Sequence, residues 1–173
     1  RSLLARMHLR AFRRIERPVA CSPFVGESVA PLLGRDLTTI PNGIDTERYT
    51  PADPQQKTRI RRQLDIPAGA TVFLSSGLLI RRKDPVTVVN AFDALQADGE
   101  QRLLIMLGDG ELRGECERLA PSNVRFVGHV DHVLPYLQAS DYFLSASRSE
   151  GLPNSVLEAI ACGLPSILSD IPA

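Results

Sequence analysis

The sequence lacks three features that would place it in a specialised class. No apolar run approaches the roughly 18 residues that a bilayer-crossing helix needs, so we expect no transmembrane segment. The net charge is zero, because 20 basic residues balance 20 acidic ones, so the overall charge gives no reason to expect nucleic-acid binding. The three cysteines, Cys21, Cys116 and Cys162, are too few and too scattered for a disulfide framework or a zinc site.

What is present is the composition of an ordinary globular protein. Hydrophobic residues make up 43% and charged residues 23% of 173 residues, enough for one domain or for one domain and part of another. The scattered thiols favour a reducing compartment, so we expect a cytoplasmic protein. The first residue is Arg1 and no apolar signal core follows it, so we expect a stretch of a longer protein.

The front of the chain predicts a basic amphipathic helix over residues 1–17. Apolar residues recur there at three- and four-residue spacing, and five arginines share the opposite face: Arg6, Arg10, Arg13, Arg14 and Arg17. Such a face suits either ordinary solvation or peripheral docking on an anionic membrane surface. A helix over Pro23–Leu33 follows, ended by Gly34. The Pro-rich segment Tyr49–Asp53 predicts a hinge, dividing the chain into 1–50 and 51–173.

Beyond the hinge, strand and helix patterns alternate. The runs of strand length are Val72–Ser76, Leu103–Leu107, Val124–Val127, Tyr142–Ala146 and Ser166–Leu168. The helical patterns are Gln55–Leu64, Pro85–Ala97, Glu111–Leu119, His132–Gln138 and Asn154–Cys162. Alternation of this kind, with strands that are continuously apolar, predicts an α/β fold with a doubly wound, Rossmann-like parallel sheet covered on both faces.

In such a sheet, ligands bind where the strands end. The amides around Gly151 to Ser155 would lie at a helix N-terminus, where an anion is favoured, and Lys83 is a point charge for a phosphate in the loop after the first strand. The carboxylates of Glu150 and Glu158 suit sugar hydroxyls. Cations, free amides and carboxylates together predict a nucleotide-sugar site.

At these residues the chain resembles the carboxy-terminal, donor-binding half of a GT-B-fold glycosyltransferase, most closely the retaining family 4, the glycosyl transferases group 1. The front of the chain resembles the end of that family's acceptor domain. The motifs that carry the resemblance follow in the family's order: Ile40–Asp45, Gly77–Lys83, Leu107–Gly110, Val124–Gly128, the paired Glu150 and Glu158, and Ala161–Pro165.

The resemblance implies hexose transfer from a UDP- or GDP-sugar to a glycan or lipid-linked acceptor, without a metal or other cofactor. It implies that Lys83 contacts the pyrophosphate and Glu150 the sugar, as the catalytic pair, and that Glu158 contacts the ribose. The further donor-binding residues that it implies are Gly77, Arg82, Gly128, His129, Val130, Gly151, Leu152, Pro153, Asn154 and Ser155.

Two positions depart from the family pattern. Leu78 stands where arginine is common after the glycine of the phosphate loop, and Asp84 stands where glycine is frequent. In the family that the chain resembles, catalysis takes place between two domains, and only the front of this chain resembles the acceptor domain, so we expect donor binding without turnover in this chain.

Other interpretations stay open. They are a non-catalytic nucleotide-sugar binding module, a nucleotide-sugar 2-epimerase of the same fold, and a nicotinamide-binding domain using Gly108, Gly110 and Gly114. A metal at His129 and His132 is disfavoured, because no further ligand lies near in sequence.

Overall fold

The computed structural model describes residues 11–95 and 100–172. The predicted basic helix therefore lies largely outside the described residues, of which 11–13 are helical. The chain forms two compact units. The first comprises Arg1–Gly43 with Ser149–Pro153 and Ile171–Ala173, and the second comprises Ile44–Arg148 with Asn154–Asp170. These units are defined by contacts, whereas the predicted domain division at residue 50 stays a prediction.

In the first unit, a single helix joins two short parallel strands. β1 (Val19–Ala20) pairs with β2 (Thr38–Thr39), and α2 (Pro23–Leu33) connects them. The helix has the predicted bounds for local reasons. The hydroxyl of Ser22 accepts a hydrogen bond from the amide of Val25 at 3.3 Å, and Gly34 ends the helix in the left-handed conformation, at φ 71°.

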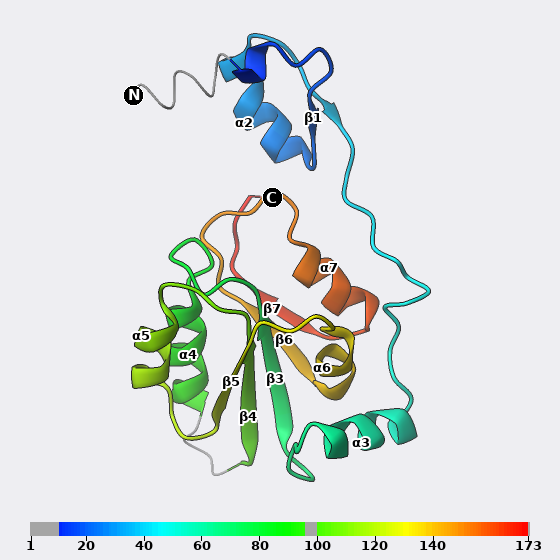
Figure 1. Ribbon diagram of the computed structural model, residues 1–173, viewed down its shortest axis with the longest axis vertical. Coiled ribbons are helices and arrows are strands. Elements are labelled where there is room, and N and C mark those ends of the chain that lie inside the picture. The colour runs from blue at the N-terminus through cyan, green and yellow to red at the C-terminus, as the bar shows by residue number, and fades with distance from the viewer. Residues whose placement is uncertain (1–10, 96–99, 173) are drawn as a thin grey trace. The chain divides into compact units, whose positions relative to one another are not determined.

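In the second unit, the described residues form a five-stranded parallel sheet in the order β5-β4-β3-β6-β7 (Figure 1). The strands are β3 (Thr71–Ser76), β4 (Arg102–Leu107), β5 (Val124–Gly128), β6 (Tyr142–Ser145) and β7 (Ser166–Leu168). The doubly wound prediction is confirmed. Strand order reverses between β3 and β6, and a crevice at the carboxyl ends of these two strands is where ligands bind in folds of this class.

Helices cover both faces of this sheet. α4 (Pro85–Ala94) and α5 (Arg113–Leu119) lie on one face, and α3 (Pro54–Gln63), α6 (Leu134–Ala139) and α7 (Asn154–Ala161) lie on the other (Figure 1). In β4, Leu103, Ile105 and Leu107 join the core under the second group of helices. The alternate residues Leu104 and Met106 join the core under α4 and α5. Because every side chain of such a strand is buried, the sequence shows a continuous apolar run.

The predicted starts of two helices are wrong by two residues. α5 begins at Arg113 and not at Glu111, and α6 begins at Leu134 and not at His132. For α5 the reason is a competing contact, because the amide of Leu112 donates to the carbonyl of Leu79 at 2.9 Å. The helices in the described ranges are all too short or too polar to cross a membrane.

Candidate functional site

The loop after β3 forms a turn that brings the side chain of Lys83 back beside Gly77, the first residue of the loop. The amide of Lys83 donates to the carbonyl of Ile80 at 2.9 Å, closing a turn. A Cβ at Gly77 would lie 3.8 Å from Cε and 3.9 Å from Cδ of Lys83. The lysine side chain therefore runs beside the backbone of Gly77, at the end of β3.

A small pocket lies at this point, between the carboxyl ends of β3 and β6. It is lined by Ser75, Ser76, Gly77, Leu78, Leu79, Lys83, Pro85, Ser145 and Ser147. Lys83 is the charged member of this set, and the serines offer hydroxyl donors. The structure thus brings the predicted Gly77 and Lys83 together at the reversal of strand order, as an anion site requires.

The loop after β4 packs backbone to backbone against the loop after β3. Gly108 has φ +109°, and a Cβ there would lie 2.0 Å from the carbonyl oxygen of Gly77. A Cβ at Gly110 would lie 2.5 Å from the carbonyl oxygen of Leu79. These two glycines are explained by loop packing, which removes the reason to interpret them as a dinucleotide fingerprint.

A second tie joins the loops after β3 and β6. The amide of Arg148 donates to the carbonyl of Arg82 at 2.8 Å, and its Nε donates to Oδ2 of Asp84 at 2.9 Å. Burial alone would raise the pKa of Asp84, but hydrogen bonds from Arg148 and Thr87 outweigh it and hold that pKa below its usual value. Asp84 keeps a left-handed φ of 47°, so the link holds a conformation that glycine adopts more readily.

On α7, the carboxylate of Glu158 has a partner that sequence reasoning did not assign to the site. Tyr49 hydrogen-bonds to it, and burial together with the negative charge of Glu158 raises the pKa of Tyr49. The same two causes raise the pKa of Cys162 to about 11, so its thiol stays protonated. Tyr49 stood in the sequence near the predicted hinge, with nothing local to connect it to a residue 109 positions later.

The segment after β5 offers an exposed imidazole. Gly128 is buried, with φ +85°, and its carbonyl accepts from the amide of Gly108 at 2.7 Å. The side chain of His129 is 85% exposed, with Nε2 3.8 Å from Oδ1 of Asp131. Val130 packs partly buried against the core. The backbone is therefore fixed while the histidine side chain is accessible.

Six of the predicted positions fall in and directly after a loop of the first unit. Glu150, Gly151, Leu152 and Pro153 belong to that unit, whereas Asn154 and Ser155 begin α7 in the second. Within the first unit, Nδ2 of Asn42 donates to the carbonyl of Leu152 at 3.4 Å. Glu150 thus belongs to the first unit and Glu158 to the second.

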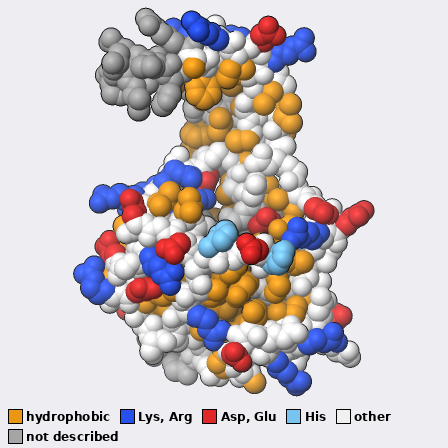
Figure 2. Space-filling model, in the orientation of Figure 1, with side chains coloured by type: hydrophobic (Ala, Val, Ile, Leu, Met, Phe, Trp, Pro, Cys, Tyr) orange, Lys and Arg blue, Asp and Glu red, His pale blue; other side chains and the backbone are white. Residues whose placement is uncertain are grey.

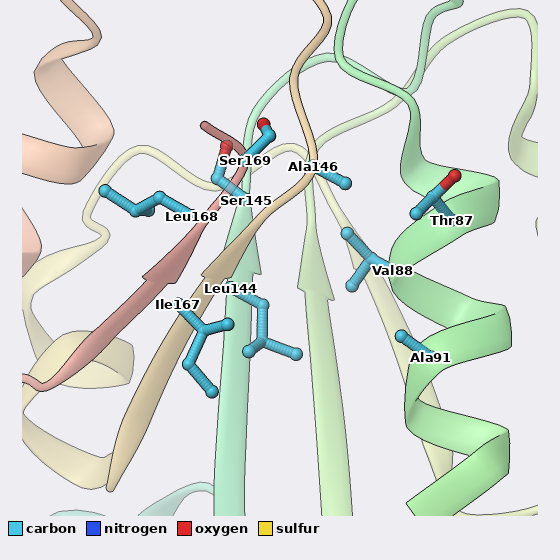
Figure 3. Close-up of a pocket in the computed structure, with 9 residues that line it drawn as sticks. All are labelled: Thr87, Val88, Ala91, Leu144, Ser145, Ala146, Ile167, Leu168 and Ser169. Carbon is cyan, nitrogen blue, oxygen red and sulfur yellow. The ribbon is translucent and has the colours of Figure 1, made fainter. Parts of the chain in front are cut away.

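A larger pocket lies between α4, β6 and β7 (Figure 3). Leu144 and Ile167, neighbours in the β6–β7 register, project into it with Val88 and Ala91 from α4. Its nine lining residues carry no charge and are mostly apolar, so it is unsuited to a diphosphate.

Charge and metal-ligand clusters give no competing site. On the visible face of the second unit, basic and acidic side chains are interspersed (Figure 2). Within residues 11–95 and 100–172, no three His, Cys, Asp or Glu side chains are grouped to hold a metal ion.

Comparison with known proteins gives concordant matches. The family model described as "Glycosyl transferases group 1" matches residues 56–173. A lipopolysaccharide core biosynthesis glycosyltransferase of Rhizobium meliloti, LpsE, is 34% identical over 162 residues, covering 90% of this chain and 44% of that protein. A GDP-mannose-dependent phosphatidylinositol monomannoside mannosyltransferase of Corynebacterium glutamicum is 31% identical over 140 residues, covering 74% of this chain and 37% of that protein.

A solved structure shares the fold. HepE of Anabaena, in complex with UDP and glucose, superposes with a TM-score of 0.84 at 21% identity, covering 95% of this chain and 47% of that one. The chain thus spans less than half the length of each of these three proteins.

Proposed function

This chain belongs to the glycosyl transferases group 1, and from that premise we propose that it binds a UDP- or GDP-sugar as the donor of a hexose. The observation that carries the proposal is the path of Lys83, which runs beside Gly77 into the pocket at the reversal of strand order. A single ammonium group among hydroxyls and loop amides suits a diphosphate. Two matched proteins support this ligand class, one named as GDP-mannose-dependent and one solved with UDP.

Each remaining site residue has a role in this proposal. Lys83 stabilises the charge that develops on the departing diphosphate, assisted by Arg82 and the amides at the start of α7. Glu158, already held by Tyr49, accepts hydrogen bonds from the ribose hydroxyls. The base lies against Gly128, His129 and Val130. Glu150 contacts the hydroxyls of the transferred sugar, and no metal ion takes part.

The longer protein would transfer this sugar to a glycan or a lipid-linked acceptor. The names of the two curated relatives support an acceptor of this class, since one acts in lipopolysaccharide core biosynthesis and the other on a phosphatidylinositol mannoside. We propose that the transfer retains the configuration of the sugar, as the resemblance to the retaining family 4 implies. The arginines of residues 1–17 would hold the protein at the cytoplasmic face of the membrane.

A second candidate is a non-catalytic module that binds the nucleotide-sugar. Leu78 favours it, because an apolar side chain that is 58% exposed stands where the family commonly places a phosphate-binding arginine. The loop packing of Gly108 and Gly110 weakens the nicotinamide alternative. Transfer activity of the longer protein would exclude the module.

Calorimetric titration with UDP, GDP, ADP and NAD tests donor binding. We expect one of UDP and GDP to bind selectively, and Lys83→Ala and Glu158→Ala each to weaken it about tenfold or more, the loss of a charge-assisted hydrogen bond. Arg59→Ala on α3 and Glu27→Ala on α2 are matched controls, because both side chains are exposed and lie outside the site.

Two results would contradict the proposal. One is binding of NAD alone, and the other is equal binding of all four nucleotides that neither site variant weakens.

A further inference from the structure

The loop Ser149–Pro153 is held by residues that precede it in the chain by more than 100 positions. We propose that Gly151 and Asn42 are positioning residues, which seat this loop against the start of α2 and thereby set how the donor sugar is bound. The inference rests on the proposed function, in which Glu150 of the loop contacts that sugar.

Gly151 is required for space and not for backbone freedom. It is absent from the described glycines with a left-handed φ, so its conformation suits any residue. A Cβ at this position would nevertheless lie 2.9 Å from Sγ of Cys21 and 3.1 Å from Cγ2 of Val25. Both distances are shorter than ordinary carbon contacts, so the backbone of the loop approaches as closely as a glycine allows.

The surface under Gly151 is formed by Cys21 and Val25, which are both half-buried. Cys21 lies between two buried residues, Ala20 at 2% and Ser22 at 4% exposed. Val25 is in the first turn of α2, where its amide donates to the hydroxyl of Ser22. An added methyl group would press on both side chains at once, and the contact is relieved by rotation of these side chains or by a shift of the loop.

Asn42 holds the loop at its next residue. Its Nδ2 donates to the carbonyl of Leu152 at 3.4 Å, linking positions 110 residues apart. Steric fit at Gly151 and this hydrogen bond at Leu152 therefore act on adjacent residues, directly after Glu150. A small shift of either moves the carboxylate that we assign to the sugar.

The nucleotide is assigned to other residues, and this separates the two effects. Lys83, Glu158 and the segment Gly128–Val130 all belong to the second unit. Displacement of the loop should therefore weaken binding of a nucleotide-sugar more than it weakens binding of the bare diphosphate.

Gly151→Ala tests the steric seat, with Gly114→Ala as its control. A Cβ at Gly114 would meet nothing within 4 Å, and this glycine too lies outside the left-handed region. In Gly151→Ala we expect faster amide hydrogen exchange at residues 149–152. We also expect affinity for UDP-glucose or GDP-mannose, whichever the unmodified chain binds, to fall about tenfold relative to UDP or GDP. Gly114→Ala should change neither quantity.

The double variant Cys21→Ala/Gly151→Ala distinguishes a local contact from general damage. Removing Sγ makes room for the new methyl group, so exchange and sugar-dependent affinity should return most of the way to those of Cys21→Ala alone. Asn42→Ala should reproduce the selective loss of nucleotide-sugar affinity in a weaker form.

The two proposals fail in different ways. Unchanged exchange at residues 149–152 in Gly151→Ala overturns the seat, whatever the chain binds. An equal loss of affinity for diphosphate and nucleotide-sugar, or no recovery in the double variant, overturns the positioning role. If the unmodified chain binds none of these nucleotides, the proposed function is wrong. Amide exchange at residues 149–152 in Gly151→Ala then decides by itself whether Gly151 holds the loop in place.

Discussion

At the scale of single residues, Asp141 gathers polar contacts from three partners in the second unit. Its carboxylate accepts from Nζ of Lys57 at 2.8 Å, from Nη2 of Arg61 at 2.6 Å and from the amide of Val72 at 2.8 Å. Burial would raise the pKa of Asp141, but these hydrogen bonds prevail and lower it. One side chain thereby fixes α3, β3 and the start of β6 together.

Asp141→Asn should destabilise the chain by about 2 kcal/mol at pH 7, since two cations lose a shared carboxylate that is 29% exposed. Because the folded-state pKa is lowered, the contribution is present above the unfolded pKa of about 3.9 and is lost as pH falls through the folded value. Urea unfolding at pH 7 and near pH 3 measures both. The exposed Asp93→Asn on α4 is the control, and a difference that persists at low pH would argue against this account.

At the scale of elements, the contact between the loops after β3 and β4 decides how Lys83 is presented. Gly108 meets the backbone of Gly77 itself, so the two strand ends cannot approach more closely, and the amide of Gly77 donates to the carbonyl of Leu107 at 3.1 Å, which links them. The proposed site therefore depends on β4, although neither β4 nor the loop after it contributes a residue to the proposed ligand contacts.

Gly108→Ala should cost about 3 kcal/mol or more, from backbone strain and from a clash that only loop movement can relieve. It should also weaken diphosphate binding, because the moving loop carries Lys83. Gly69→Ala is the matched control: Gly69 has φ +79° but open space around its Cα, so only the strain of about 1 kcal/mol applies. Thermal unfolding and calorimetry of both variants give the comparison, and equal behaviour would refute the clash.

Most elements of the second unit could be predicted because local patterns specify them. Apolar runs marked each strand, and Pro85 and Asn154 marked helix starts. The rule that ligands gather at strand ends pointed to Gly77 and Lys83, which line one pocket in the structure, and their contact with a donor stays a prediction. Contacts between distant segments could not be predicted: the Tyr49–Glu158 pair, the Arg148–Asp84 link and the seat of Gly151 each join residues with no periodic relation.

At the scale of the whole molecule, the two units differ greatly in what they bury. The first has Ala20 and Leu33 as its buried apolar side chains among the described residues, whereas two clusters fill both faces of the sheet in the second. A parallel sheet buried on both faces, as in the second unit, is the structure that binds nucleotides at its strand ends in folds of this class. Transfer also needs a surface that holds an acceptor.

We therefore expect this chain to bind donor without catalysing transfer. The measurement is release of UDP or GDP from UDP-glucose or GDP-mannose in the presence of a simple acceptor glycoside, with a complete group 1 glycosyltransferase that uses the same donor as the positive control. Release by the chain at a rate comparable to that of the control would show that residues 1–173 suffice.

The strand order has a consequence for how the chain acquires its structure. β3 is the central strand, yet its pairing of Phe73 with Tyr142 closes a loop of about 70 residues, while β4 pairs with its other edge much earlier in the sequence. During synthesis, β3 and β4 emerge first and leave one apolar edge of β3 open until β6 arrives. The interval between these two events is when the chain is most exposed to aggregation. Asp141, directly before β6, binds both backbone groups of Val72 on that edge: its amide donates to the carbonyl of Val72 and its carboxylate accepts from the amide of Val72, each at 2.8 Å.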